Sequence, residues 1–211
     1  MTPDQTHVIA SAAGLDALYD APIERSLRKQ LDRLDDRCRA FIAASPLLII
    51  GTQSAAGIAD NSPRGDHPGF VTAPDDHTLL IPDRRGNNRL DTLHNIVENP
   101  AVGLLFLIPG LTQSFRVNGH AVISTDPALL AQFTYQGKQP RTVMIVKVQE
   151  AYVQCSRALV RADVWSPAKQ IKDGECSVPT FGAMLEAHTR GFVDGKALDE
   201  ENKTRIAQTL Y

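Results

Sequence analysis

The stretch "IPDRRGNNRLDTLHNIVENPAVGLLFLIPG", residues 81–110, sets the order of elements around which the rest of the chain can be arranged. An apolar run ends at Pro82, and a turn rich in arginine, asparagine and glycine follows it. From about 90 to 98 the apolar residues recur at helical spacing, and Asn99-Pro100 ends this helix. "AVGLLFLIPG" is then the most apolar strand candidate. We therefore expect a strand, a basic turn, a short helix and a buried strand in succession.

Further strands are expected on both sides of this stretch. A turn is expected over 54–63, and Asn118-Gly119 marks a bulge or a tight turn. Short strands with few helices between them favour an antiparallel barrel or closed sheet. No GxGxxG motif follows the first strand, which disfavours a Rossmann fold. The predicted strands cover 46–53, 69–73, 77–82, 101–110, 113–125 and 142–155.

Helices are expected at both ends of the strand-rich region. Apolar residues recur every three or four positions over 22–45, which predicts one amphipathic helix ended by Ser45-Pro46. The chain shows no linker, internal repeat or low-complexity segment, so we expect one domain, 1–211. Within it we expect the helix 22–45, the barrel over 46–156, a helical extension over 157–211, and short helices over 127–133, from 156 to about 165, and over 181–188.

The composition is that of an ordinary globular protein, with 211 residues, 43% of them hydrophobic and 22% charged. A net charge of −2 and a pI near 6.3 do not suggest a nucleic-acid or anionic-membrane surface. No apolar stretch is long enough to span a bilayer, and the first residues do not resemble a secretory signal. Cys38, Cys155 and Cys176 form no CxxC pair, which fits reduced cytoplasmic thiols better than disulfides or a metal site.

The basic turn combines groups that suit a phosphate monoester. Arginine side chains offer forked donors, asparagine side chains offer amides, and a glycine lets the backbone approach a ligand. The helix that follows adds free N–H groups and the positive end of its dipole. The alternative is an exposed strand-to-helix turn in which Asn88 is the helix cap. The candidate phosphate ligands are Arg84, Arg85, Gly86, Asn87, Asn88 and Arg89.

Two other clusters are weaker when each is taken alone. "NSPRGDHPGF" (61–70) places charge in an irregular segment, where Arg64 and Asp66 could simply pair with each other. For His67, a hydrogen-bonded loop histidine is the favoured interpretation over a metal ligand or general base. Gln113, Ser114 and Arg116 begin a strand, where they could instead form an ordinary polar outer face.

In order along the chain, "SPRGD", the 81–110 stretch and "SFRVNGHA" together resemble the FMN-binding split-barrel group related to pyridoxamine 5'-phosphate oxidase. The resemblance covers roughly residues 22–166 and includes "QCSRALVRADVW", which is similar to a segment of one bacterial branch. It implies a mainly β protein with flanking helices (α+β), built on a six-stranded antiparallel split barrel. It also implies a homodimer that holds FMN at its interface. The implied cofactor-binding residues are Arg64, Gly65, Asp66, Pro82, Asp83, Arg84, Asn87, Asn88, Arg89, Gln113, Ser114 and Arg116.

The chain departs from the true oxidase where that enzyme binds its substrate. Gly69 occupies the approximate place of a lysine, and neither the later Tyr/Arg/Ser set nor the final arginine–histidine pair is matched. We therefore expect a substrate other than pyridoxamine phosphate. Lys138, Arg141 and Trp165 are candidates for contribution from the neighbouring subunit.

These features together predict a cytoplasmic FMN-dependent oxidoreductase that acts on a small organic substrate. NAD(P)H or oxygen would be its electron partner, and no catalytic acid or base is identified. Two alternatives stay open. The protein could bind flavin without turnover, as a sensor or carrier, or the same barrel could hold haem or a deazaflavin.

Overall fold

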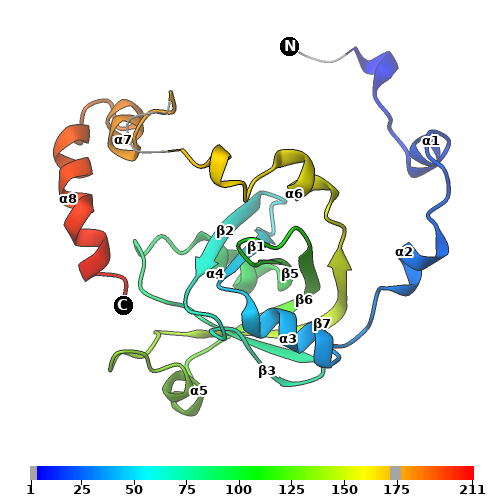
Figure 1. The fold of residues 1–211 in the computed structure, drawn as a ribbon, viewed down its shortest axis with the longest axis horizontal. Coiled ribbons are helices and arrows are strands. Elements are labelled where there is room, and N and C mark those ends of the chain that lie inside the picture. The colour runs from blue at the N-terminus through cyan, green and yellow to red at the C-terminus, as the bar shows by residue number, and fades with distance from the viewer. Residues whose placement is uncertain (1–3, 172–176) are drawn as a thin grey trace.

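The computed structural model describes residues 4–171 and 177–211, which form a seven-stranded sheet with helices around it (Figure 1). All neighbouring strands are antiparallel, in the order β2-β1-β5-β6-β7-β4-β3. The strands are β1 (Leu47–Gln53), β2 (Ala59–Gly65), β3 (Thr72–Asp75), β4 (Thr78–Pro82), β5 (Ala101–Leu107), β6 (Ser114–Ser124) and β7 (Val143–Gln154).

The helices are mostly short, and their positions agree with the expected ones for α4, α5, α6 and α7. No helix of the described residues is long and apolar enough to cross a membrane. The helices are α1 (Ala12–Asp16), α2 (Glu24–Arg28), α3 (Asp36–Ala44), α4 (Asp91–Glu98), α5 (Pro127–Gln132), α6 (Arg157–Ala162), α7 (Phe181–His188) and α8 (Gly195–Gln208), with 3-10 turns η1 (Gln5–His7) and η2 (Pro167–Lys169).

The sheet corrects two expectations. It has seven strands rather than six, and within the described ranges its edge strands β2 and β3 do not pair, so barrel closure is not found. The segment 54–63 is only partly a turn, because β2 begins at Ala59 and pairs along β1. Polar residues and Pro63 conceal this strand in the sequence. Proline is tolerated there because β2 is an edge strand, which leaves one side of its backbone unpaired.

The core lies on one face of the sheet, under α3 and α4. In β1 and β5 alternate residues are buried, among them Leu48 and Ile50 from β1 and Leu104 and Phe106 from β5. Ile42 of α3 is 1% exposed and belongs to the same cluster. Burial of each such side chain contributes about 1.5–3 kcal/mol to folding. The alternate apolar residues of β1 and β5 therefore stabilise these segments as strands, because one side of each strand faces the core.

The Asn118-Gly119 step is a bulge, one of the two forms expected there, and the register between β6 and β7 shifts at it. A Cβ atom at Gly119 would lie 2.1 Å from the carbonyl oxygen of Lys147. No side chain fits at that distance, so the bulge requires glycine here. The bulge lets the long strand β6 bend while it stays paired with β7.

The expected single helix over 22–45 is wrong, because the chain forms α2 and α3 with an extended segment between them. Leu31 in this segment exchanges two backbone hydrogen bonds with Ala151 of β7. Pairing with a strand distant in sequence thus overrides the local helical pattern.

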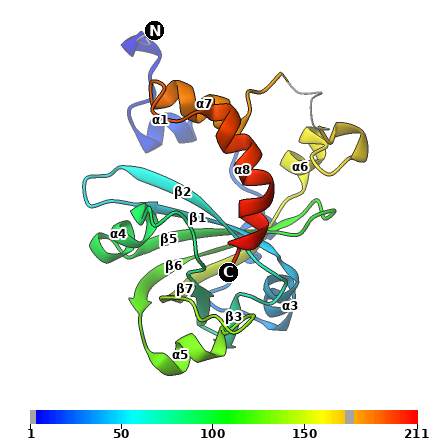
Figure 2. The same ribbon diagram turned by 90° about the vertical axis from the view of Figure 1, so that its left-hand side faces the viewer.

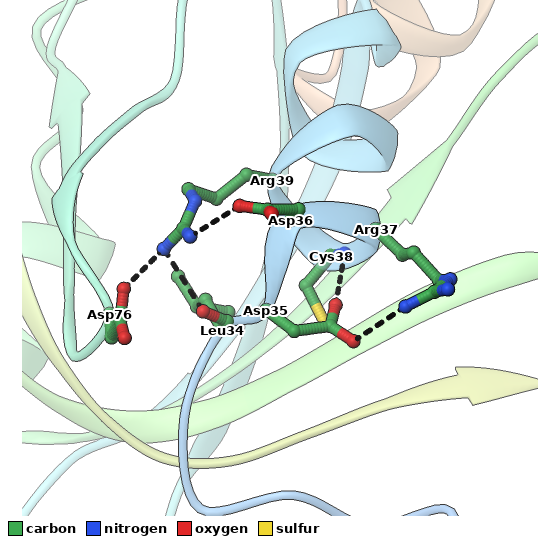
Figure 3. A network of polar contacts seen from close by, with 7 residues as sticks. All are labelled: Leu34, Asp35, Asp36, Arg37, Cys38, Arg39 and Asp76. Atoms are coloured by element: carbon green, nitrogen blue, oxygen red, sulfur yellow. Dashed lines mark hydrogen bonds and ion pairs between the residues drawn. The ribbon is translucent and has the colours of Figure 1, made fainter.

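A network of polar contacts fixes the start of α3 (Figure 3). The Asp35 carboxylate caps the helix by accepting from the Cys38 N–H at 2.8 Å. The Arg39 guanidinium donates to the Leu34 carbonyl at 3.0 Å and pairs with Asp76 in the β3–β4 turn. These contacts join α3 to the far edge of the sheet. A capping aspartate of this kind contributes about 0.5–2 kcal/mol.

The amino-terminal segment runs away from the sheet as an arm that carries α1 and α2 (Figure 1). Every residue from 6 to 28 is exposed. Several of these are large apolar side chains, including Leu18 at 67% exposure and Tyr19 at 73%. The arm therefore presents apolar surface that the sheet of the same chain does not cover.

The carboxyl-terminal helices α7 and α8 pack against each other through two glycines. A Cβ atom at Gly182 would lie 2.0 Å from the Gly195 carbonyl oxygen, so only glycine allows this crossing. From the crossing, α8 runs towards the sheet (Figure 2), and Tyr211 beyond it reaches Asp66 just after β2. The sequence predicted a helical extension over 157–211 but did not single out α8, whose polar residues show little helical amphipathicity.

Candidate functional site

A cavity of about 1140 Å³ lies between β2, the turn from β4 into α4, the segment before β7 and Tyr211. The 81–110 stretch supplies most of one wall. The residues that line it are 60–65, Phe70, 82–93, 138–142 and Tyr211.

The face of β2 that meets the cavity carries Asp60, Ser62 and Arg64. These residues alternate with more exposed ones along the strand, as period-two geometry requires. Thr92 in the first turn of α4 donates from Oγ1 to the Asp60 carboxylate at 3.0 Å. This bond joins the floor of the cavity to the helix that follows the basic turn.

Two ion pairs cross between the end of β2 and the end of β4. Nη1 of Arg64 lies 2.6 Å from Oδ1 of Asp83, and Nε of Arg84 lies 2.6 Å from Oδ2 of Asp66. Arg84 also donates to the Phe133 carbonyl oxygen at 2.6 Å. The alternative in which Arg64 pairs with Asp66 is therefore not what the chain forms. Each arginine is partly buried and neutralised by a carboxylate from the other segment.

Asp66 is the centre of a wider network, and its side chain is only 1% exposed. It accepts from the Tyr211 hydroxyl at 2.5 Å and from the His67 backbone N–H at 2.8 Å. Burial raises the pKa of Asp66, but hydrogen bonds from Tyr211, Arg84 and His67 outweigh it, so the pKa falls below its ordinary value. The hydrogen bond to Asp66 is the main cause that raises the pKa of Tyr211 to about 12. Asp66 lines neither cavity of the site directly, so it holds other side chains in place.

The basic turn is open and exposed. Asn88 has a φ of 60°, and Asn87 accepts from the Arg89 N–H at 2.9 Å. Arg89 pairs with Asp91, while Arg85 makes no hydrogen bond or ion pair within the described ranges. The turn therefore offers exposed guanidinium groups at the cavity rim.

The start of α4 at this turn lacks a side-chain cap. Its N-cap residue is Leu90, which makes no capping hydrogen bond, so Asn88 is not the cap that the alternative interpretation assigned. The first N–H groups of a helix have no partner within the helix. The first residues of α4, Asp91, Thr92 and Leu93, line the cavity.

The third predicted cluster lies apart from this cavity. Gln113, Ser114 and Arg116 do not line it. Ser114 is buried, Gln113 is exposed, and Arg116 donates to the Tyr152 hydroxyl at 2.9 Å. Trp165 donates from its indole N–H to the Leu111 carbonyl at 2.7 Å. Within one chain, the structure brings together the first two clusters but not the third.

Several cavity residues were not predicted or were assigned differently. Lys138 and Arg141 line the cavity of their own chain, although the sequence suggested that a neighbouring subunit would contribute them. Lys138 donates from Nζ to the Tyr211 backbone oxygen at 2.6 Å. Two buried polar atoms of the lining, Nε of Arg64 and Oγ1 of Thr142, have no hydrogen-bond partner. An unsatisfied buried polar atom is costly, so these two atoms indicate a polar ligand.

More than half of the chain matches a known protein family. The model of the amino-terminal pyridoxamine 5'-phosphate oxidase domain matches residues 34–155, which include the whole sheet. The chain belongs to this family. The match contains both crossed ion pairs and the basic turn, but not Tyr211. No curated protein matches the chain.

Solved structures resemble the chain over part of its length. HupZ from Group A Streptococcus is 19% identical, with a TM-score of 0.48 over 57% of this chain and 93% of that one. A putative pyridoxamine 5'-phosphate oxidase from Lactobacillus delbrueckii is 20% identical, with a TM-score of 0.47 over 59% and 98%. An FMN-binding protein from Syntrophomonas wolfei is 12% identical, with a TM-score of 0.43 over 56% and 83%. No group of three or more potential metal ligands occurs in the described part of the chain.

Proposed function

We propose that the 1140 Å³ cavity binds FMN and that the protein is an FMN-dependent oxidoreductase acting on a small organic substrate. The observation that carries this proposal is the charge of the cavity. Six cationic and three acidic side chains line it, together with the two buried polar atoms that lack a partner. A ligand that combines a phosphate dianion with a polar ring system fits this set of groups.

The phosphate end of FMN would lie at the basic turn. Arg85 and Arg89 are exposed there, Arg141 donates to Asn88 at 3.4 Å, and the uncapped start of α4 adds backbone N–H groups. A hydrogen bond between a guanidinium and a phosphate contributes about 1.5–3 kcal/mol net. Arg84 is a weaker candidate than the sequence suggested, because Asp66 and the Phe133 carbonyl already hold its guanidinium.

The ring and ribityl end of FMN would lie deeper, near Pro82, Asp83 and Arg64. Nε of Arg64 and Oγ1 of Thr142 are donors without partners in this part of the cavity. FMN supplies two-electron redox chemistry when it is bound. The chain orients it, and the Arg64 guanidinium, which Asp83 holds in place, supplies hydrogen-bond donors that favour the reduced form.

The substrate is proposed to differ from pyridoxamine phosphate. Gly69 stands approximately where the true oxidase has a lysine, and its φ is 87°, in the left-handed region. A lysine would be strained in this conformation, whereas glycine is not. The backbone conformation at this position therefore favours glycine over the lysine of the true oxidase.

A homodimer with FMN at the interface is also proposed. The apolar side chains of the amino-terminal arm are exposed in one chain, which supports their burial against a second copy. In such a dimer, Gln113, Ser114 and Arg116 of one subunit are candidates to reach the cofactor of the other. Light scattering at micromolar concentration tests this, and a monomer would contradict it.

The decisive experiment is an absorption spectrum of the purified protein, followed by titration with FMN. Paired flavin bands that are released on heating, and that chromatography identifies as FMN, support the proposal. A Soret band would indicate haem, and a single deazaflavin band would indicate that cofactor. If FMN binds but the protein never oxidises NADH or NADPH, a non-catalytic flavin carrier or sensor is the better interpretation.

The role of Arg64 has its own test. Arg64→Ala should lower the midpoint potential of bound flavin, because it removes a guanidinium donor and leaves the negative charge of Asp83 unpaired near the ring. Arg28→Ala, which changes an exposed arginine on the arm, is the matched control. An unchanged potential with normal FMN affinity would remove Arg64 from this role.

A further inference from the structure

Tyr211, which follows α8, lines the 1140 Å³ cavity and contacts three of the segments around it. Its hydroxyl donates to Oδ1 of Asp66 at 2.5 Å, and its backbone oxygen accepts from Nζ of Lys138 at 2.6 Å. Its ring centroid lies 4.6 Å from that of Tyr135 and 5.7 Å from Cζ of Arg84. Arg84 and Tyr135 also line a smaller cavity of about 340 Å³. Tyr211 therefore connects the end of β2, the basic turn and the segment before β7 on one side of the larger cavity.

The hairpin of α7 and α8, which leads to Tyr211 (Figure 2), packs mainly on itself. Asp199 of α8 accepts from the Gly182 N–H at 2.8 Å and from the Thr180 hydroxyl at 2.5 Å. Gly182 and Gly195, where the helices cross, are the buried residues of α7 and α8. Within the described ranges, no residue of either helix belongs to the hydrophobic clusters of the sheet. Tyr211 therefore anchors a hairpin that contributes little to the core.

Asp66 can lose the Tyr211 hydroxyl without being left unpaired. Nε of Arg84 lies 2.6 Å from its Oδ2, and the His67 backbone N–H donates to its Oδ1 at 2.8 Å. A Tyr211 hydroxyl that left Asp66 would be hydrated. A buried polar group without a partner is costly, and neither group would be in that state. The contact between Tyr211 and Asp66 can therefore break and reform while the ends of β2 and β4 stay joined.

We propose that Tyr211 is a lid residue of the larger cavity. The cavity opens to a ligand when the Tyr211 hydroxyl leaves Asp66, and it closes when the hydroxyl returns. That this ligand is FMN rests on the proposed function. Entry and release both require the open state, so a weaker closed state speeds both. The affinity hardly changes, because the free and the bound protein both remain mostly closed.

The first test is stopped-flow fluorescence with FMN, which measures the association and dissociation rate constants. Tyr211→Phe keeps the ring but loses a hydrogen bond to a charged group, so both constants should rise roughly tenfold. Their ratio, Kd, should stay within about twofold of the wild type. Thr204→Val is the matched control, because it removes an exposed α8 hydroxyl that donates to the Glu201 carbonyl of the same helix. Unchanged rate constants in Tyr211→Phe, or a rise in the dissociation rate constant alone, would overturn the lid.

The second test needs no FMN. Fluorine NMR of the full chain labelled with 3-fluorotyrosine identifies Tyr211 by the signal that Tyr211→Phe lacks. In the wild type this signal should lie away from the position of free 3-fluorotyrosine. Lys138→Ala should move it towards that position, because the donor to the Tyr211 backbone oxygen is lost.

A wild-type Tyr211 signal at the free position, or one that Lys138→Ala leaves in place, would contradict the closed state. The two tests also separate the lid from the proposed function. If the wild type failed to bind FMN, the proposed function would be refuted, whereas the shift of the Tyr211 signal in Lys138→Ala would still support the lid.

Discussion

The arginines around the larger cavity fall into an inner and an outer group. The inner side chains, Arg64 and Arg84, are 21% and 15% exposed, and each pairs with a carboxylate from another segment. The outer side chains belong to Arg85, Arg89 and Arg141, which are exposed. Neighbouring arginines in the sequence, such as Arg84 and Arg85, thus have different roles. The inner ion pairs hold the ends of β2 and β4 together. The outer arginines lie at the surface, where an anion can reach them, and the pair of Arg89 with Asp91 is itself exposed.

The largest expected effect comes from breaking an inner pair. Asp66→Asn would leave the partly buried Arg84 without a counter-charge, so the free energy of unfolding should fall by about 3–5 kcal/mol. Urea denaturation measures this change. Asp91→Asn is the control, because its exposed pair with Arg89 should be worth less than about 1 kcal/mol. Equal losses in the two variants would remove the distinction between inner and outer pairs.

The outer group should act on the ligand rather than on the fold. Arg89→Ala should weaken FMN binding by about 1.5–3 kcal/mol, or roughly 10- to 150-fold, by removing a charged phosphate donor. Its free energy of unfolding without FMN should change by less than about 0.5 kcal/mol. Fluorescence titration measures the affinity, with Arg28→Ala as the control. Unaltered affinity in Arg89→Ala would place the phosphate elsewhere.

The pH dependence of stability sharpens the comparison further. The pKa of Asp66 lies below its ordinary value of 3.8 in the folded chain, so its ionised form stabilises the fold above that value. This contribution is lost as the pH falls through the lowered pKa. The stability difference between wild type and Asp66→Asn should therefore be largest near neutral pH and shrink below about pH 4. A difference that stays constant down to pH 2 or so would show that charge is not its cause.

The smallest expected effect is that of salt. Raising the ionic strength from about 0.05 to 0.5 M shortens the screening length and should weaken FMN binding by roughly threefold, because the outer arginines are exposed. The inner pairs are screened less. FMN titration and urea denaturation at the two salt concentrations compare the groups directly. If salt lowered the free energy of unfolding more than it weakened FMN binding, the inner pairs would be the more exposed group, contrary to this assignment.

The parts of the fold that the sequence predicted are those set by burial. β1, β5, β6 and β7 contain apolar runs or alternation that a sheet with one covered face imposes on the residues. Asn118-Gly119 was likewise predicted as a bulge or a tight turn, and the bulge places the Gly119 backbone too close to Lys147 for a side chain. The edge strand β2 was missed, because its polar side chains face the cavity and resemble a turn.

The remaining differences arise from contacts between distant parts of the chain. Leu31 pairs with Ala151, and this ends the helix that the local pattern favoured. The crossed pairing of Arg64 with Asp83 depends on the ends of β2 and β4 meeting, which spacing along the chain does not reveal. Tyr211 reaches Asp66 from the far end of the described chain, so no sequence motif could have placed it at the site.

The packing of α7 against α8 determines the position of Tyr211, which lies in the wall of the larger cavity. A methyl group at Gly182 would collide with the backbone at Gly195 and pivot α8 outward. Tyr211 follows α8, so its hydroxyl would swing out of reach of Asp66. One added methyl group at Gly182 would thereby open the side of the cavity that Tyr211 lines, while the lining residues on the sheet and in the basic turn keep their places.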